Sequence, residues 1–297
     1  MTYSIVTICY NNLLGLIKTR ESIVSQTFKD YEWIVIDGGS TDGTKEFLQC
    51  HSDEFAYWCS EKDKGVYNAQ NKGIAIAKGD YIICMNSGDV FHDSEVLSAV
   101  SSLGFSADIM YGDWLRVYPN GKTEKKEAPK KLPPYFFYYS NICHQAMFIR
   151  REVMQSHPFD EAYAVVADWA KWRELREIGC TFGYLPITVC DFEAGTGLSE
   201  RFDEKCAKDC ERLKSAIPPE IQQDIDGITK DLRDYISKQD RMLKECNELS
   251  QMHISELNGK IGELQSQLDN KYVQKVCQMM QRGGIRKFFL RMFMKII

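Results

Sequence analysis

An acidic, glycine-rich segment follows directly on an apolar run near the N-terminus, and it constrains the fold more than any other feature. Residues 31–37 read YEWIVID and continue as GGSTDG to residue 43. Apolar, β-branched and aromatic residues in such a run predict a buried strand, and the glycines predict a turn after it. Open α/β sheets bind their ligands at the carboxyl ends of such strands. We therefore predict an α/β fold with a binding site at this loop.

The composition of the loop indicates which ligands it suits. It lacks the lysine of a phosphate-binding P-loop and the Gly-x-Gly-x-x-Gly spacing of a dinucleotide fold. Asp37 and Asp42 instead suit hydroxyl and N–H donors, such as a ribose and the edge of a nucleobase. The alternative is a structural turn in which both aspartates only cap the next helix.

The first 200 or so residues have the organisation of one α/β domain. Residues 4–12 (SIVTICYNN) form a second strand-like run ending in polar residues, and a helical pattern follows from Leu14 to Ser25. Short apolar strands then alternate with helical patterns and turns, which is typical of the α/β class.

Six segments occur in order along the chain: VTICYNN, VIDGGSTDGT, SEKDKGVYNAQNKGIAIAKGDYI, MNSGD, ICHQAMFIRREV and ADWAKWREL. Together they resemble the inverting glycosyltransferases of family 2, which have the GT-A fold, and in particular their bacterial surface-polysaccharide branch. The resemblance implies a GT-A nucleotide-sugar-binding domain with a mixed central sheet over residues 1–215. It also implies transfer of a sugar from a nucleoside diphosphate sugar, with UDP as the nucleotide, to a glycan or lipid-linked acceptor. The Gln-x-x-Arg-Trp signature of processive synthases is absent, so we expect one sugar to be added per encounter.

The resemblance also assigns residues to the donor nucleotide. Asp37 matches the aspartate that contacts the nucleobase or ribose, and Asp63 matches the second nucleotide-contacting carboxylate. As an alternative, Asp63 is only a turn former ahead of Lys64-Gly65. The full predicted set is Tyr10, Asn11, Asp37, Ser40, Asp42, Asp63 and Lys72.

The metal site that the resemblance implies has fewer carboxylates in this chain than in other family members. Family members carry Asp-x-Asp after the strand that here reads YIICMNSGD, and this chain has Ser87-Gly88-Asp89 in that place. Asp89 matches the aspartate that binds the metal directly. One carboxylate, two diphosphate oxygens and waters form an oxygen ligand set that Mn²⁺ or Mg²⁺ accepts. The missing first acid argues against tight metal binding without nucleotide.

Asp168 is the residue that we expect to act as the general base. It matches the central acid of the family's acidic-Asp-x-Asp pattern ahead of a leucine-rich helix, whereas Ala167 and Ala170 replace the flanking acids. The alternative for Asp168 is a helix cap. In the resembling branch a His-Gln pair lines the active site, and the matching residues here are His144 and Gln145.

Charge and cysteine content limit the partners and the compartment. The net charge of −5 gives no indication of nucleic-acid binding. Eleven scattered cysteines form no metal-type CxxC pair. Met1 leads directly into a predicted strand, and no apolar run is long enough to span a bilayer. These features predict a cytoplasmic protein with reduced thiols.

The chain changes character after Pro218-Pro219, where it becomes polar and helical. Apolar residues recur at steps of three and four, as at Ile225, Ile228 and Leu232, which predicts a long helix, coiled coil or helical hairpin over residues 220–278. Its partner is the first domain, a second copy in a homo-oligomer, or another protein. The alternative is a solitary amphipathic helix folded back on the domain.

The final segment, residues 282–297, reads RGGIRKFFLRMFMKII. From Lys271 onward the chain carries seven basic residues and no acidic ones. A basic amphipathic helix with aromatic residues suits an anionic membrane surface. We therefore predict peripheral binding at the inner face of the plasma membrane; the alternative is a terminal helix packed on the protein.

Two other functions stay open on the sequence. The first is a membrane-associated coiled-coil scaffold with a degenerate transferase domain, for which Ser87, Ala167 and Ala170 are the support. The second is a sugar nucleotidyltransferase, although CYNNLLGL lacks the Gly-rich, Arg/Lys-containing loop that such an enzyme needs.

Overall fold

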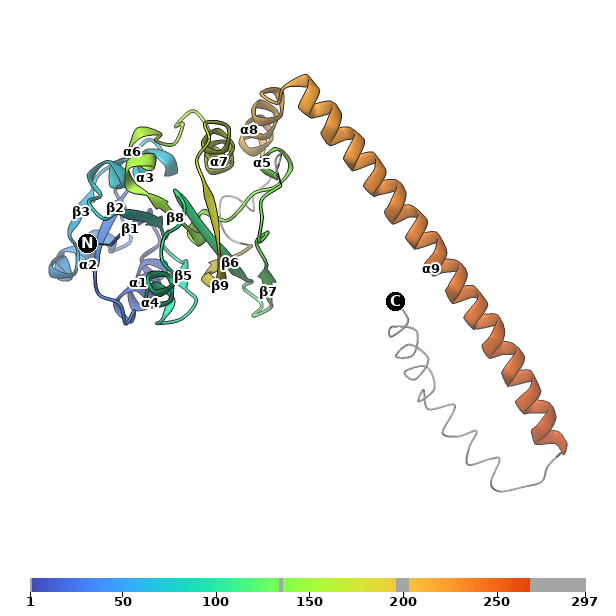
Figure 1. The fold of residues 1–297 in the computed structure, drawn as a ribbon. Helices are drawn as coiled ribbons and strands as arrows, with labels where there is room; N and C mark the ends of the chain where they lie inside the picture. The colour runs from blue at the N-terminus through green and yellow to red at the C-terminus, as the bar shows by residue number, and fades with distance from the viewer. Residues whose placement is uncertain (1, 134–135, 196–202, 268–297) are drawn as a thin grey trace. The chain divides into compact units, whose positions relative to one another are not determined.

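The computed structural model describes residues 2–133, 136–195 and 203–267 (Figure 1). By its internal contacts the chain divides into a compact unit, Met1–Ile221, and a second unit, Gln222–Ile297. The first unit is an α/β domain with one mixed sheet, which confirms the predicted fold class. The cysteines of the described residues are free thiols.

The described strands of the first unit form a single nine-stranded sheet. They are β1 (Tyr3–Cys9), β2 (Tyr31–Asp37), β3 (Tyr57–Ser60), β4 (Tyr81–Cys84), β5 (Val90–Phe91), β6 (Ile109–Val117), β7 (Thr123–Lys126), β8 (Met147–Arg150) and β9 (Phe182–Glu193). Their order is β3-β2-β1-β4-β8-β6-β9-β5, with β7 paired to β6. The strands β3, β2, β1 and β4 are parallel, β8 is antiparallel to both neighbours, and β6 and β9 are parallel to each other.

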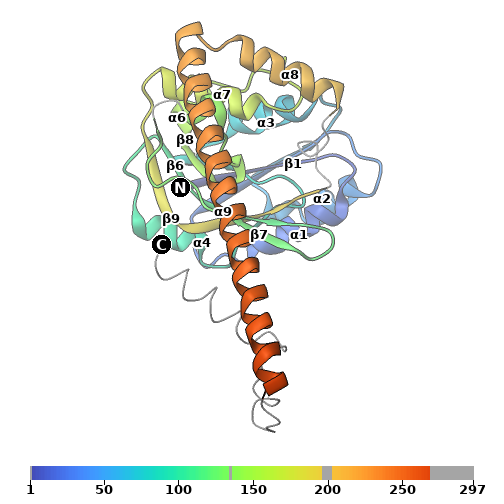
Figure 2. The same cartoon turned by 90° about the vertical axis from the view of Figure 1, so that its right-hand side faces the viewer.

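Helices cover both faces of this sheet. They are α1 (Leu13–Val24), α2 (Thr44–Cys50), η1 (Ser52–Glu54), α3 (Val66–Ile76), α4 (Val96–Leu103), α5 (Phe136–Tyr139), η2 (His144–Ala146), α6 (Arg151–Ser156), α7 (Ala167–Glu177) and α8 (Glu204–Ser215). In Figures 1 and 2, α3, α6 and α7 lie on one face, and α1 and α4 lie on the other.

Strand β1 shows why the sequence folds in this way. Its alternate residues enter two separate cores: Val6 and Ile8 pack on the face that carries α3 and α7, and Ile5 and Cys9 pack on the face that carries α1 and α4. Every residue of β1 is buried. A continuous apolar run is what a central parallel strand, covered on both faces, requires.

The strand register brings the functional loops to one edge. Cys9 pairs with Asp37 and Asp37 pairs with Ser60, so β1, β2 and β3 end side by side. Because β8 is antiparallel to both β4 and β6, β6 runs in the same direction as β4. At the ends of β6 and β9, Val117 pairs with Glu193. The carboxyl ends of both halves of the sheet therefore face the same way.

Helix α9 (Pro219–Gln267) is one continuous helix of 49 residues. It begins one residue before the predicted start at residue 220, because proline is well tolerated in the first turn of a helix. Several of its large apolar side chains are exposed, including Tyr235, Leu249 and Met252. The coiled coil and its partner stay predictions. Residues 268–278 and the predicted membrane helix at 282–297 lie outside the described residues. No helix in the described part of the chain has the length and apolarity needed to span a membrane.

Candidate active site

Hydrogen bonds join the loops after β1 and β2 into one structure. Asn11 has a left-handed backbone, with φ of 49°. Its N–H donates to the Ser40 hydroxyl at 2.7 Å, and its side-chain oxygen accepts from the Thr41 N–H at 2.9 Å. The Leu13 N–H donates to Asp42 Oδ2 at 2.9 Å. Asn11, Ser40 and Asp42, which the sequence assigned to the nucleotide, therefore shape the two loops that would receive it.

Asp37 lies at the centre of this structure and is completely buried. Its carboxylate accepts from the Ser40 N–H at 3.0 Å, from the Ser40 hydroxyl and from the Ser60 hydroxyl at 2.6 Å. It thereby ties the loop after β2 to the end of β3. These contacts give Asp37 a structural role, and its direct contact with the nucleotide stays a prediction.

Asp42 is exposed and also stabilises the start of α2. Its carboxylate accepts from the Thr44 hydroxyl at 2.6 Å and from the Thr44 N–H at 3.2 Å. Desolvation by its immediate neighbours acts to raise the pKa of Asp42, but the bonds from Thr44 and Leu13 together outweigh it and lower the pKa. The capping interpretation therefore describes part of what Asp42 does.

Tyr10 and Asp63 are the predicted donor residues that meet at the surface. A Cβ added to Gly38 would lie 2.5 Å from Asp63 Oδ2 and 3.2 Å from Tyr10 Cδ2, so both side chains converge on this glycine. Tyr10 is 66% exposed, and its ring is free to stack on a flat ligand. Asp63 also accepts from the Gly65 N–H at 2.9 Å, as a turn former would. Lys72 on α3 forms an ion pair with Glu61 at 2.7 Å.

Asp89 lies in the turn between β4 and β5 and is 5% exposed. Its Oδ2 accepts from Gln145 Nε2 at 2.6 Å, and its Oδ1 accepts from the Glu193 N–H at 3.2 Å. Burial raises the pKa of Asp89 to about 6, although the bond from Gln145 and the proximity of His144 oppose the rise.

Asp168 lies in the first turn of α7, and its side chain is 16% exposed. Its Oδ2 faces His144 Nδ1 at 3.3 Å, and its Oδ1 accepts from the Trp169 N–H at 2.7 Å. The helix begins after Val166, and no side-chain capping bond is present there. The contact with His144 thus distinguishes Asp168 from a simple helix cap.

The short helix η2 connects these two carboxylates. His144 and Gln145 are consecutive residues, and they bind Asp168 and Asp89 respectively. The structure therefore brings four of the predicted site residues into one hydrogen-bonded group.

One residue of this region, Asp209, could not be identified from the sequence. Asp209, a buried residue of α8, accepts from the backbone N–H groups of Ala164, Val165 and Val166 at 2.8, 2.7 and 3.4 Å. These groups directly precede α7, so Asp209 holds the start of the helix that carries Asp168. Nothing distinguishes Asp209 from the other charged residues of a polar helix until the fold is known.

The residues around Asp89 fit a cation that also binds the donor. In the described part of the chain, no group of three or more His, Cys, Asp or Glu side chains could hold an ion on its own. A Cβ added to Gly88 would lie 2.8 Å from Glu193 Oε2, so a second carboxylate is close to the turn. The charge of Glu193 also contributes to the raised pKa of Asp89. A cation would relieve this repulsion and take its remaining ligands from diphosphate and water.

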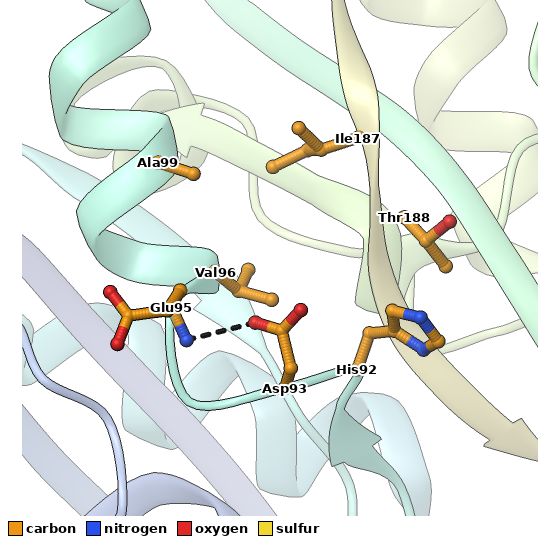
Figure 3. A pocket seen from close by; sticks show the side chains of 7 residues that line it. All are labelled: His92, Asp93, Glu95, Val96, Ala99, Ile187 and Thr188. Atoms are coloured by element: carbon orange, nitrogen blue, oxygen red, sulfur yellow. Dashed lines mark hydrogen bonds between the residues drawn. The ribbon is translucent and has the colours of Figure 1, made fainter.

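A separate cavity of about 240 Å³ lies between α4 and β9 (Figure 3). It is lined by His92, Asp93, Glu95, Val96, Ala99, Ile187 and Thr188. The Asp93 carboxylate accepts from the Glu95 N–H at 2.8 Å, as drawn in Figure 3. None of the predicted site residues lines this cavity, so it does not enlarge the candidate site.

Comparison with known proteins identifies the family. Residues 4–156, more than half of the chain, match the family model described as "Glycosyl transferase family 2". The chain belongs to glycosyl transferase family 2. A PGL/p-HBAD biosynthesis glycosyltransferase of Mycobacterium bovis is 27% identical to this transferase over 211 residues, which are 68% of this chain and 81% of the relative. An uncharacterized glycosyltransferase of Mycobacterium tuberculosis is 43% identical over 181 residues, 56% of this chain and 66% of the relative. The predicted enzyme class, glycosyltransferase, is thereby confirmed.

Solved structures support the fold of the transferase. S. aureus TarS (residues 1–349) in complex with UDP-GlcNAc has a TM-score of 0.56 and 15% identity, over 68% of this chain and 61% of that chain. A mannosyltransferase from Pyrobaculum calidifontis in complex with GDP-Man and Mn²⁺ has a TM-score of 0.51 and 15% identity, over 66% of this chain and 58% of that chain. The transferase thus spans about three-fifths of these solved chains. At this identity the likeness concerns the fold alone, which is GT-A-like, as predicted.

Proposed function

We propose that this family 2 transferase moves one sugar, with inversion, from a nucleoside diphosphate sugar to a hydroxyl of a glycan or lipid-linked acceptor. The observation that carries the proposal is the pairing of Asp168 and Asp89 through the consecutive residues His144 and Gln145. This pairing puts a carboxylate that can take a proton beside one that can hold a cation. Bacterial surface-polysaccharide synthesis is the setting that the motifs favour.

The donor would bind at the edge formed by the loops after β1, β2 and β3. The exposed ring of Tyr10 would stack on the base, and Asp63 would accept hydrogen bonds from the base or the ribose. UDP is the nucleotide that we propose. One structural neighbour is described with UDP-GlcNAc and another with GDP-Man, so both nucleotides belong in the test.

The chemistry follows from the position of Asp168. Its carboxylate accepts the proton of the acceptor hydroxyl, while the hydroxyl oxygen forms a bond to the anomeric carbon. The bond from that carbon to the diphosphate breaks on the opposite face, so the configuration inverts. Asp89 would hold Mn²⁺ or Mg²⁺ together with the donor, and the cation would supply positive charge that stabilises a diphosphate leaving group.

Nucleotide binding is expected to depend on Asp63. UDP should raise the melting temperature more than GDP, and a ligand at 100 times its Kd adds about 2.7 kcal/mol of stability. Asp63→Asn should weaken UDP binding about tenfold through the loss of a charged hydrogen-bond acceptor. The exposed Asp53→Asn is the matched control and should bind like the wild type. A thermal-shift titration decides the matter: equal affinities for Asp63→Asn and wild type would remove Asp63 from the donor site.

We also propose that residues 282–297 bind an anionic membrane, where a lipid-linked acceptor would be found. Deleting these residues should release the protein from phosphatidylglycerol vesicles, since each basic residue near such a surface contributes about 1 kcal/mol. Binding of the full chain should weaken with salt, because the Debye length is about 8 Å at physiological ionic strength. Transfer to a short water-soluble acceptor should be unchanged. Equal co-sedimentation of full-length and shortened protein would show instead that the tail packs on the protein.

A further inference from the structure

A chain of side-chain hydrogen bonds extends from the buried core to Asp168. Gln70 Nε2 of α3 donates to Asn86 Oδ1 at 3.2 Å. Asn86 Nδ2, in the loop after β4, lies 3.0 Å from His144 Nε2. His144 Nδ1 lies 3.3 Å from Asp168 Oδ2. Three separate elements and the loop after β4 therefore meet in one line of polar groups that ends on the candidate base.

The charge of Asp168 sets the direction of this chain. An ionised carboxylate only accepts hydrogen bonds, so the facing atom, His144 Nδ1, must carry the hydrogen. In a neutral imidazole the other nitrogen, Nε2, is then an acceptor and needs a donor. The Asn86 amide supplies this donor with Nδ2, and this leaves Asn86 Oδ1 to accept from Gln70. Every bond in the chain thus points toward Asp168.

Gln70 is an unusual residue to find in this position. It is completely buried, and its Oε1 atom has no hydrogen-bond partner among the described residues. A buried polar atom without a partner typically costs about 1–3 kcal/mol, whereas an apolar side chain of the same shape would avoid that cost. Packing alone therefore gives no reason for an amide here. Among the described residues, the side chain of Gln70 makes one hydrogen bond, to Asn86 Oδ1.

We propose that Asn86 and Gln70 are positioning residues that hold His144 as the neutral Nδ1–H tautomer and, through it, fix the orientation of the Asp168 carboxylate. The proposal rests on the proposed role of Asp168 as the base. If the tautomer were reversed, the unprotonated Nδ1 would face the carboxylate, and lone pairs would repel each other across 3.3 Å. Asp168 would then turn away from the acceptor hydroxyl.

The tautomer can be measured directly with ring-¹⁵N-labelled histidine in the full chain. The chain has five histidines, and comparison with His144→Gln identifies the signal of His144. The wild type should show a protonated Nδ1 and an unprotonated Nε2 at His144. Asn86→Ala should give a mixture of tautomers and lower kcat about 10- to 100-fold, as loss of a supporting hydrogen-bond partner commonly does, with the donor KM unchanged. Gln70→Met should produce the same change to a smaller extent.

Gln26 provides a matched control. It is also a completely buried amide, and it bonds to the Ser22 and Asp93 carbonyls and to the Leu97 N–H, away from the site. Gln26→Met should lower the melting temperature but leave the His144 signal and kcat unchanged. An unchanged tautomer in Asn86→Ala, or equal effects of Gln26→Met and Gln70→Met on kcat, would overturn the proposal. The ring signal does not depend on transfer, so a failure of Asp168 as the base would be seen separately, in its own variant.

Discussion

Asp168→Asn should lower the rate of sugar transfer by about two to four orders of magnitude, because an amide cannot take the proton of the acceptor hydroxyl. The side chain keeps its shape, and its one oxygen can still accept from the Trp169 N–H, whereas its amide nitrogen replaces the oxygen that faces His144. The fold and the affinity for the donor nucleotide should therefore stay close to those of the wild type.

Release of nucleoside diphosphate in the presence of acceptor measures this effect. Asp160→Asn is a suitable control, since Asp160 is a nearby surface carboxylate whose side chain pairs with Arg212 at 2.8 Å, outside the proposed chemistry. Transfer by Asp168→Asn within threefold of the wild type would exclude Asp168 as the base.

Asp89→Asn should abolish most of the activity together with its dependence on Mn²⁺ or Mg²⁺, because no other carboxylate occupies the place of the family's metal-binding aspartate. A titration of metal ion in the presence of UDP measures both effects in one experiment. If the wild type is equally active in excess chelator, the proposed metal role is wrong.

The same substitution should remove a pH-dependent cost from the folding of the metal-free protein. The pKa of Asp89 rises from 3.8 to about 6 through burial, so between these values the folded protein binds more protons than the unfolded chain. Wild-type stability therefore falls as the pH rises through this window, and the full penalty is present above pH 6. Asparagine carries no charge and avoids the penalty, which is on the order of 1–3 kcal/mol.

Melting temperatures of both proteins in excess chelator, from pH 4 to pH 8, test this expectation. The difference between them should grow across the window and then stay constant. Parallel curves would show that Asp89 titrates at its ordinary pKa in the folded protein.

Local patterns in the sequence were enough to predict the fold class and individual candidate residues of the site. The run YEWIVID predicts a buried strand because periodicity and side-chain shape are local properties, and β2 covers these residues. Asp89 and Asp168 were predictable as candidates because each lies within a recognisable motif. Their common link through His144 and Gln145 was not, since it depends on how η2 packs against α7 and the end of β4.

The residues that hydrogen-bond to the site from the core could not be predicted from the sequence for the same reason. Gln70 and Asn86 lie in matched segments, yet no spacing indicates that their side chains meet. Asp37 and Asp42 were assigned to a ligand, whereas the described contacts also give them loop-building and helix-capping roles. The sequence does not distinguish a polar residue that hydrogen-bonds within the protein from one that binds a ligand.

The position of Asp209 has a consequence for how members of this family are classified. The family model ends at residue 156, whereas Asp168 and the residue that secures its helix both lie beyond that point. A match to the family model alone therefore covers the donor loops and Asp89 but not the proposed base. A proposal of transfer activity also has to be judged on Asp168 and Asp209.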